Sequence, residues 1–355
     1  MKLNRRVSIK RIAAGYLGCL APKLAFGHTE VTFPFRLLQG FEAAFPSMGA
    51  TINLRWYSNH EKQDRVVEAA TKIADQWESV LSDYSPNSQA MLACSQADDG
   101  NWIPLSNELW NVVSLCDQWQ RWSDGAFDAA LGTITRLRRQ RKLASQGQWD
   151  EARSKSGWKL LELDATNQSI RFAIPGLRLD FGAIGKGVVV DKIAERLSEM
   201  EIEEHVVNAS GNMRIGQAPP NTKGWPIAID FPMSDARKQS LELLRTRLSR
   251  CGIATSGDRW QRFPDASGIT EKGYSSHIID PRTKVGVSGH QSVTIIAENA
   301  TDADAAATAT CVRSQRDLAG WLKTLAEKKP KLLAIVLQTD ESNETIRMIS
   351  TANDL

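Results

Sequence analysis

The chain has 355 residues, of which 42% are hydrophobic and 24% are charged, and its formal net charge is only +3. This composition is typical of a soluble globular protein that can bury a sizeable core. No Lys/Arg run beyond the N-terminus looks like a track for a nucleic-acid backbone, and no apolar run reaches the roughly 18 residues that a membrane span needs.

The N-terminal segment resembles a bacterial twin-arginine export signal. Adjacent arginines at 5–6 precede a short apolar stretch at 12–20, and small residues at 25–27 have the spacing that a signal peptidase accepts. We therefore expect residues 1–27 to be an export signal peptide and the protein to act in the periplasm. Residues 28–355 would form the mature domain, with room for two lobes. An ordinary secretory signal or a disordered basic tail is the alternative.

The first part of the mature chain predicts one strand and two helices. Residues 50–57 alternate between apolar and polar, which predicts a half-buried strand. Residues 58–61 have the form of a capping box, and apolar residues recur every three or four positions from there to about Ser82. A second amphipathic helix is expected to start near Ser106.

The second part predicts further strands and helices without a regular βαβ alternation. Leu177, Leu179 and Phe181 predict a strand that ends at a glycine-containing turn, and a short helix carrying Ile193 and Leu197 follows. Three more strands and an Ala-rich helix are expected at 227–231, 292–297, 332–337 and 303–311. The fold class is therefore α+β, and the absence of GxGxxG after a strand and of GxxxxGK[ST] does not favour a Rossmann or P-loop site.

The cysteines beyond the signal form no CxxC pair, so a zinc site is not expected. The periplasm permits disulfides, but the sequence does not pair these residues. The simplest expectation is that each is a small buried apolar residue, and this applies to Cys94, Cys116, Cys251 and Cys311.

Two stretches could carry phosphate or metal chemistry. Residues 180–187 lead from the predicted strand through a glycine-rich turn with one lysine into a helix, which presents backbone N–H groups and a cation to a phosphate. Asp304 and Thr308 lie one helical turn apart, so both oxygen ligands could reach one Mg²⁺. The plainer interpretations are a tight strand-to-helix connection and an acid that favours the first turn of its own helix.

Two further stretches are candidates for a binding site. Residues 125–128, Gly-Ala-Phe-Asp, follow the second helix, and the glycine lets a ligand approach the backbone. Residues 277–281 bring a histidine and an aspartate together. Alone, the first stretch could be a helix stop with a core phenylalanine, and the second could be a buried histidine beside a turn.

Together these stretches resemble the FAD:protein FMN transferase (ApbE) family. The motifs occur in the same order and with similar residues, over about 45–312. The matching segments are Met48-Gly49-Ala50-Thr51, Leu81-Ser82-Asp83-Tyr84 with Ser88, Gly125-Ala126-Phe127-Asp128, 180–191, Ser256-Gly257-Asp258, 277–281 and 303–308. This sequence departs from the family by an inserted Ala50, by Gly185 in place of alanine, and by Asn208-Ala209-Ser210-Gly211-Asn212 in place of Asn-x-Gly-Gly-Asp.

The resemblance implies an ApbE-like (T-fold-like) architecture of mixed or antiparallel sheets with flanking helices, and it implies a set of site residues. Positions where the family contacts FAD are Met48, Tyr84, Ala126, Phe127, Asp128, Asp180, Lys186 and Ile278. Positions where it holds Mg²⁺ are Asp304, Thr308 and the backbone carbonyl of Ala183.

The implied activity is a Mg²⁺-dependent transfer. FAD is cleaved, FMN is attached through a phosphoester to a Thr or Ser of a target protein, and AMP leaves. His277 is our candidate for relaying the hydroxyl proton, with Asp280 as its nearest rival, and Asp304 contributes to catalysis through the metal. The implied partner is a flavin-accepting protein of a membrane electron-transfer complex. An FAD pyrophosphatase that makes FMN and AMP, and a non-catalytic periplasmic flavin-binding protein, are the alternatives.

Overall fold

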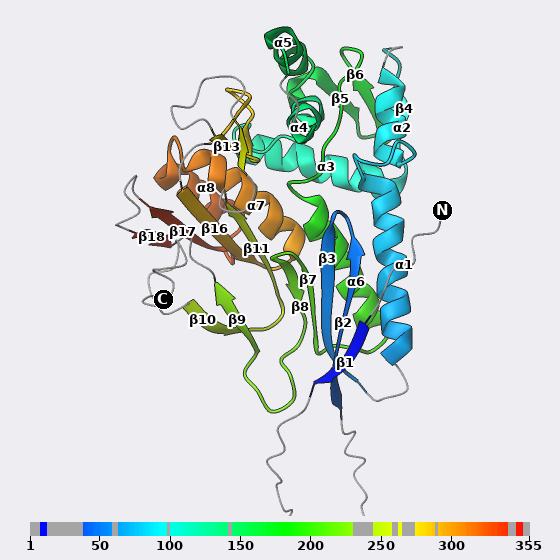
Figure 1. Ribbon diagram of the computed structural model, residues 1–355, viewed down its shortest axis with the longest axis vertical. Helices are drawn as coiled ribbons and strands as arrows, with labels where there is room; N and C mark the ends of the chain where they lie inside the picture. The colour runs from blue at the N-terminus through cyan, green and yellow to red at the C-terminus, as the bar shows by residue number, and fades with distance from the viewer. Residues whose placement is uncertain are drawn as a thin grey trace, which may run out of the picture.

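A nine-stranded antiparallel sheet forms the centre of the protein (Figure 1). The computed structural model describes residues 8–12, 38–58, 63–97, 100–140, 144–229, 244–257, 262–264, 274–287, 290–339 and 346–350. In sheet order the strands are β1 (Ser8–Ile12), β2 (Gln39–Ser47), β3 (Ala50–Ser58), β7 (His205–Ala209), β8 (Asn212–Ile215), β11 (Cys251–Gly257), β16 (His290–Ala297), β17 (Leu333–Thr339) and β18 (Ile346–Ser350). All neighbouring pairs run antiparallel.

Three helices pack together against this sheet and build the main core. They are α1 (Gln63–Leu81), α6 (Gly185–Glu199) and α7 (Ala300–Arg313). Helix α6 lies between α1 and α7, and α7 packs on β11 and β16. A further helix, α8 (Leu318–Lys328), contacts α7. None of the helices in the described ranges is long and apolar enough to cross a membrane.

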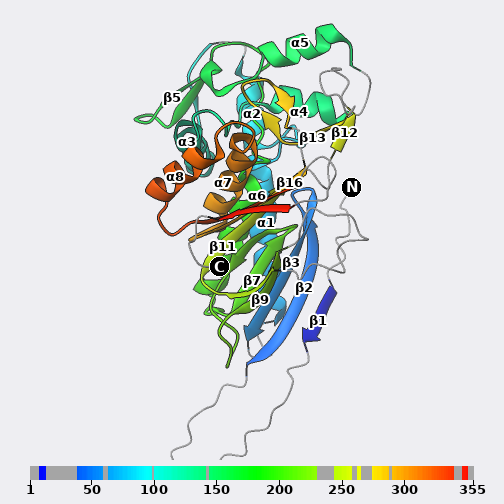
Figure 2. The same cartoon turned by 90° about the vertical axis from the view of Figure 1, so that its left-hand side faces the viewer.

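A smaller group of elements gathers at one end of the molecule (Figures 1 and 2). It contains α2 (Gln89–Ser95), α3 (Asn107–Trp122), α4 (Gly132–Arg139), α5 (Gln146–Ser154) and the small sheet of β4 (Ile103–Pro104), β6 (Ser169–Phe172) and β5 (Leu161–Asp164). Two-stranded pairs complete the described fold: β9 (Trp225–Ile229) with β10 (Leu244–Leu248), β12 (Arg262–Pro264) with β13 (Tyr274–Ser276), and β14 (Ile279–Asp280) with β15 (Val285–Gly286). The α+β class with an antiparallel sheet is confirmed.

Several predicted elements are present with small shifts at their ends. The strand expected at 50–57 is β3, and the first predicted helix is α1, which ends at Leu81. Most of the predicted capping box at 58–61 lies outside the described residues. The second helix is α3, and its N-cap is Ser106, whose Oγ accepts a hydrogen bond from Leu109 N at 3.2 Å. Most of segment 1–27 also lies outside the described residues, and β1 is the part of it that is described.

Two predictions were wrong in detail. Residues 177–181 are not a strand; they form an extended connection whose backbone joins the 129–132 segment by Asp180 N to Ala129 O (2.8 Å) and Gly132 N to Arg178 O (3.0 Å). The alternating apolar residues reflect burial of this connection, not a sheet ladder. The Ala-rich helix α7 begins at Ala300, so Asp304 lies beyond its first turn.

The four cysteines expected to be buried, Cys94, Cys116, Cys251 and Cys311, are buried and free. Burial raises the pKa of the Cys94 and Cys251 thiols to about 11, which makes both poor nucleophiles at neutral pH.

Candidate functional site

The glycine-rich stretch predicted to bind phosphate forms the N-terminus of α6. The N-cap, Ile184, provides no side-chain hydrogen bond to the first helical amides. The preceding turn is held by Asp180, whose Oδ1 accepts from Gly182 N at 2.7 Å, and Lys186 Nζ donates to Gly182 O at 3.2 Å. A helix N-terminus with one half-buried lysine is suited to an anion.

Asp304 of α7 points its carboxylate at this helix start. Its Oδ2 accepts a hydrogen bond from Gly187 N at 3.0 Å, and the residue is only 3% exposed. Burial raises the pKa of the Asp304 carboxyl, and Lys186 and the Gly187 N–H oppose that rise. Among the described residues no other hydrogen bond or ion pair reaches this carboxylate. A buried carboxylate with one neutral donor lacks compensation, which a hard cation would supply.

Asp191 makes the matching connection in the opposite direction, from α6 to α7. Its Oδ1 accepts from Ala300 N at 2.9 Å, and its Oδ2 accepts from Thr301 N at 2.8 Å and Thr301 Oγ1 at 2.6 Å. Each helix therefore lends a carboxylate to the N-terminal amides of the other. The two helices come close because residue 187 is glycine: a Cβ there would lie 2.4 Å from Ala300 O.

Thr308, the second predicted side-chain ligand of Mg²⁺, lies one turn after Asp304 and is half-buried. Its Oγ1 is 3.5 Å from Ser256 Oγ of β11, a distance at the limit of a hydrogen bond. Ala183, whose carbonyl completes the predicted ligand set, is partly buried in the turn before α6. The predicted ligands thus come from the α6 start and one face of α7, and all of their donor atoms are oxygen.

Two residues predicted to contact FAD flank this helix start. Met48 lies in the β2–β3 turn with φ 53°, and its Cε is 3.6 Å from the position that a Cβ on Gly185 would occupy. That contact distance is ordinary, so the alanine usual in the family would fit at position 185. Tyr84 is 74% exposed, with the Arg139 guanidinium 4.7 Å from its ring centroid.

Arg139 connects the Tyr84 segment to the α6 turn. It forms ion pairs with Asp83 and, at 2.8 Å, with Asp180 Oδ2. Burial, and then the charge of Asp180, raise the pKa of the Asp83 carboxyl, and Arg139 opposes that rise. Arg139 was not identified from the sequence. The run of basic residues that begins at Arg136 could have marked this segment as a candidate for binding an anion.

The side chains of the Gly-Ala-Phe-Asp stretch make contacts within the protein. The Ala126 and Phe127 side chains are buried in the main core. Both oxygens of Asp128 accept from backbone N–H groups, Ala130 at 2.7 Å and Trp158 at 2.9 Å. Gly125, with φ 71°, ends the turn after α3, and the FAD contacts predicted for this stretch stay a prediction.

His277 and Ile278 lie between β13 and β14, beside the last turn of α4. Arg138 of α4 donates to Ser276 O at 2.9 Å, and the next residue, Arg139, reaches Asp180. Ile278 packs in the main core, whereas His277 is half-buried. α4 is thus the element that ties this segment to the Asp180 turn.

Asp280, the rival of His277, is occupied. It forms an ion pair with Arg316, and its Oδ1 accepts from Arg282 N at 2.9 Å in the turn that follows. The Asp280 carboxylate therefore holds the β14–β15 turn and Arg316 in place.

The segment that departs most from the family is the tight turn between β7 and β8. Ser210 there has φ 52° and Gly211 has φ 99°, while Gly211 N donates to Asn208 Oδ1 at 2.8 Å. Asn212 is buried, and its Oδ1 has no hydrogen-bond partner in the described structure. Ser210 therefore occupies a left-handed position that glycine adopts more readily.

Comparison with known proteins agrees with this arrangement. The model of a family described as the ApbE family matches residues 48–335, well over half of the chain. The chain belongs to the ApbE family. The match spans the β2–β3 turn, the α6 start and α7, which are the elements that bring the candidate residues together.

Two curated relatives are similar to this chain over most of their length. The FAD:protein FMN transferase of Chlamydia muridarum is 26% identical over 86% of this chain and 90% of that relative. The FAD:protein FMN transferase of Escherichia coli K12 is also 26% identical, over 84% of each chain. The solved structure of the flavin transferase ApbE from Vibrio cholerae has a TM-score of 0.74 at 19% identity, covering 89% of this chain and 98% of that chain. The ApbE-like fold is therefore confirmed.

Proposed function

We propose that this ApbE-family chain is an FAD:protein FMN transferase. The proposal is that it splits FAD, attaches FMN through its phosphate to a Thr or Ser hydroxyl of an acceptor protein, and releases AMP. The observation that carries it is the convergence of Lys186, at the N-terminus of α6, with the buried carboxylate of Asp304 from α7. The names of the relatives that align over most of the chain support the same reaction.

We propose that Asp304, Thr308 and the Ala183 carbonyl hold Mg²⁺. The fit rests on the chemistry of the donors: all are oxygen atoms, and the single carboxylate among them is buried with incomplete compensation. When bound, the ion supplies positive charge beside the diphosphate as the P–O bond breaks.

The protein residues then have distinct tasks. Lys186 binds diphosphate oxygens, while Met48 and the exposed Tyr84 ring border the remainder of FAD. The acceptor hydroxyl oxygen bonds to the phosphorus on the FMN side, the bond from that phosphorus to the bridging oxygen breaks, and AMP leaves with the bond electrons. His277 accepts the hydroxyl proton. Catalysis consists mainly of positioning and electrostatic stabilisation.

The proposal also covers where the protein acts and which protein accepts the FMN. The arginine pair and apolar stretch in 1–27 support export to the periplasm, by the twin-arginine route, and the acceptor would be a flavin-bearing subunit of a membrane electron-transfer complex. The competing functions are an FAD pyrophosphatase, in which water replaces the acceptor hydroxyl, and a non-catalytic flavin carrier. The metal set favours an enzyme over a carrier.

The decisive experiment compares Asp304→Asn with Asp302→Asn. Both carboxylates belong to α7, but Asp302 pairs with Lys329 at 2.7 Å, away from the α6 start. Each protein is incubated with FAD, Mg²⁺ and candidate acceptors, and labelling is read by in-gel flavin fluorescence and acceptor mass. We expect Asp304→Asn to lose transfer by about a hundredfold to a thousandfold without unfolding, and Asp302→Asn to retain it.

Direct Mn²⁺ binding, measured by electron paramagnetic resonance, separates the metal role from other losses of activity. We expect the wild type and Asp302→Asn to bind the ion and Asp304→Asn to lose it. Full transfer by Asp304→Asn, with only a lowered melting midpoint, would remove the metal role. Production of FMN and AMP with no labelled acceptor would instead favour the pyrophosphatase.

A further inference from the structure

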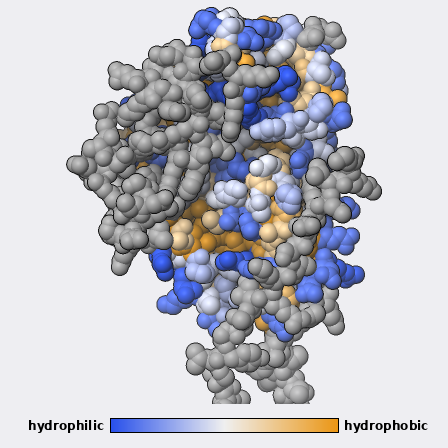
Figure 3. Space-filling model, in the orientation of Figure 1, coloured by the Kyte–Doolittle hydropathy of each residue, from blue (hydrophilic) through white to orange (hydrophobic). Residues whose placement is uncertain are grey.

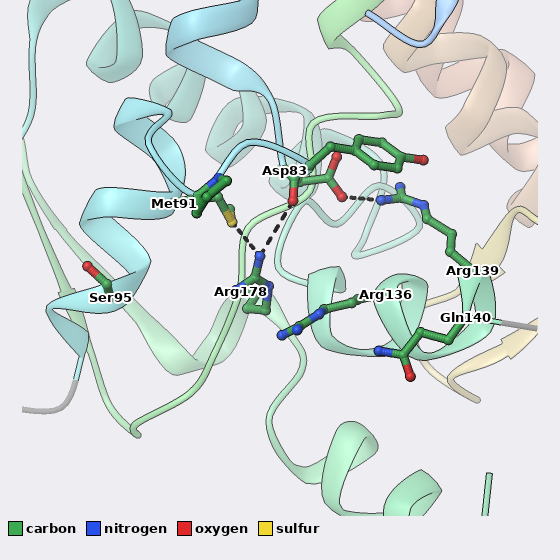
Figure 4. A pocket seen from close by; sticks show the side chains of 9 residues that line it. Asp83, Met91, Ser95, Arg136, Arg139, Gln140 and Arg178 are labelled. Carbon is green, nitrogen blue, oxygen red and sulfur yellow. Dashed lines mark hydrogen bonds and ion pairs between the residues drawn. The ribbon is translucent and has the colours of Figure 1, made fainter. Parts of the chain in front are cut away.

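A hollow of about 450 Å³ lies beside the candidate site (Figure 4). Its walls come from the segment that follows α1, from α2, from the last turn of α4 with the residue after it, and from the 177–181 connection. The residues that line it are Asp83, Tyr84, Pro86, Met91, Ser95, Arg136, Arg139, Gln140 and Arg178. Three of these are arginines and one is an acid, so the lining is basic.

The arginines in the last turn of α4 have three different roles. Arg138 donates to the backbone carbonyl of Ser276, and Arg139 is neutralised by Asp83 and Asp180. Arg136 is exposed, and its guanidinium has neither a hydrogen bond nor an ion pair with any residue that the structure describes. It is therefore the α4 arginine whose charge is left for a ligand.

Arg178 brings a second uncompensated charge into the hollow from a separate segment. Its Nη2 lies 2.7 Å from Met91 Sδ and 3.5 Å from Asp83 O, and no carboxylate in the described ranges pairs with it. Figure 4 shows the Arg136 side chain extending toward Arg178. The one lining carboxylate, Asp83, is already taken by Arg139.

A plainer explanation accounts for half of this arrangement. Basic residues in the last turn of a helix are stabilised by the helix dipole, and that is sufficient for Arg136 alone. It does not explain Arg178, which belongs to no helix and is only half exposed. Two guanidinium groups that converge without an acid between them repel each other, and an anion bound between them would relieve that repulsion.

We propose that Arg136 and Arg178 form a binding site for a phosphate dianion, free or as a phosphomonoester, separate from the diphosphate site at Lys186. Guanidinium groups bind phosphate oxygens through paired charge-assisted hydrogen bonds, and a phosphomonoester carries nearly two negative charges at neutral pH. Two sources share this chemistry, inorganic phosphate and a nucleoside monophosphate. The proposed phosphate site is argued from the positions of the two arginines. That AMP is the ligand rests on the proposed function, because that reaction releases AMP.

Arg139 connects the hollow to the turn before α6. Arg139 pairs with Asp83, which lines the hollow, and with Asp180, which holds the turn before α6. Both of its ion pairs use carboxylates that would otherwise compete with an incoming anion. Arg136 and Arg178 are thereby left uncompensated on the hollow side.

The test is isothermal calorimetry on the mature protein at fixed ionic strength, with inorganic phosphate and AMP as separate titrants and FAD as a third. The variant is Arg136→Gln, which is expected to fold because the side chain is exposed and unpartnered. The matched control is Arg196→Gln, because Arg196 is also an arginine in the last turn of its helix but pairs with Glu199. The control therefore reproduces the dipole effect without the hollow.

We expect saturable binding of phosphate or AMP that weakens at least about tenfold in Arg136→Gln and less than about twofold in Arg196→Gln. FAD affinity should stay within about twofold of wild type in both variants. Tighter binding of AMP than of phosphate identifies the nucleotide as the source, and equal binding identifies the free anion. No saturable binding, or unchanged binding in Arg136→Gln, would overturn the proposal.

An equal loss of FAD affinity in Arg136→Gln would also overturn it, since the pair would then belong to the dinucleotide site. Failure of FMN transfer is measured separately, by acceptor labelling. A protein that binds phosphate at Arg136 but labels no acceptor would contradict the proposed function and leave this site standing.

Discussion

Buried carboxylates near the α6 start differ in how many of their oxygens the protein already uses. Asp128 and Asp191 accept backbone hydrogen bonds on both oxygens, so they serve the fold. Asp180 is shared between Arg139 and Gly182 N. Asp304 has a single backbone donor, which is why it alone of these four fits a metal ligand. At the scale of the residue, the hydrogen-bond partners separate structural from functional acids.

Lys186→Ala tests the cation beside the proposed diphosphate. We expect FAD binding to weaken by about 1.5–3 kcal/mol, because a charge-assisted hydrogen bond to phosphate is lost. Calorimetry with FAD is the measurement, and Lys192→Ala is the control, since Lys192 lies on the same helix but pairs with Glu195 at 2.7 Å. Equal affinities in the wild type and Lys186→Ala would make the glycine-rich turn merely a connection.

At the scale of the element, α6 and α7 act as one unit. Each donates an acid to the N-terminal amides of the other, and Gly187 permits their close approach. The proposed metal ligands are divided between the turn that opens α6 and the face of α7. Their relative positions therefore depend on this helix pair more than on either helix alone.

Asp191→Asn should weaken that pair. One carboxylate oxygen becomes an amide that cannot accept from the α7 amides, so we expect the free energy of unfolding to fall by about 1–3 kcal/mol. Urea denaturation measures the change, with Glu195→Gln as the control on an exposed position of the same helix. A midpoint as high as that of the wild type would mean that α7 is held by its apolar packing alone.

At the scale of the whole molecule, the central sheet separates the proposed site from a second cluster. The helices cover one face, and Val206, Ile215, Trp225, Cys251 and Ile253 pack together as a separate cluster. On the surface seen in Figure 3, apolar side chains gather beside the main sheet, whereas the end with α4 and α5 is mostly hydrophilic.

The β7 strand begins with His205, a buried histidine whose Nδ1 donates to Ile202 O at 2.7 Å.

His205 predicts how global stability depends on pH. Burial lowers its pKa below the ordinary value of 6.5, so the unfolded chain binds the proton more readily than the folded one. This stabilisation is complete above pH 6.5 and is lost as the pH falls through 6.5 toward the folded pKa. Melting midpoints measured from pH 7.5 to 5 should fall less steeply in His205→Gln than in the wild type. Parallel curves would show that other groups control acid unfolding.

Much of the fold was predictable because local patterns decide it. The alternation at 50–57 and the three-to-four spacing behind it identified β3 and α1, and Ser106 marked the start of α3. The 177–181 connection was mistaken for a strand because alternation records which side chains are buried, not whether the backbone has a partner strand. α4 was missed because its eight residues carry only a short apolar pattern among arginines.

By itself, the sequence determined the class of the fold, the ApbE family and the residue types of the proposed site, because motifs and periodicity are local properties of the chain. Only the tertiary structure decided which acids are already satisfied, that Asp304 meets Gly187 across two helices, and that Phe127 belongs to the core. It also decided that Arg136 and Arg178 share one hollow. These outcomes depend on contacts between residues far apart in the chain. A local sequence pattern does not predict which distant residue will pair with a charged group or bury a hydrogen-bonding atom.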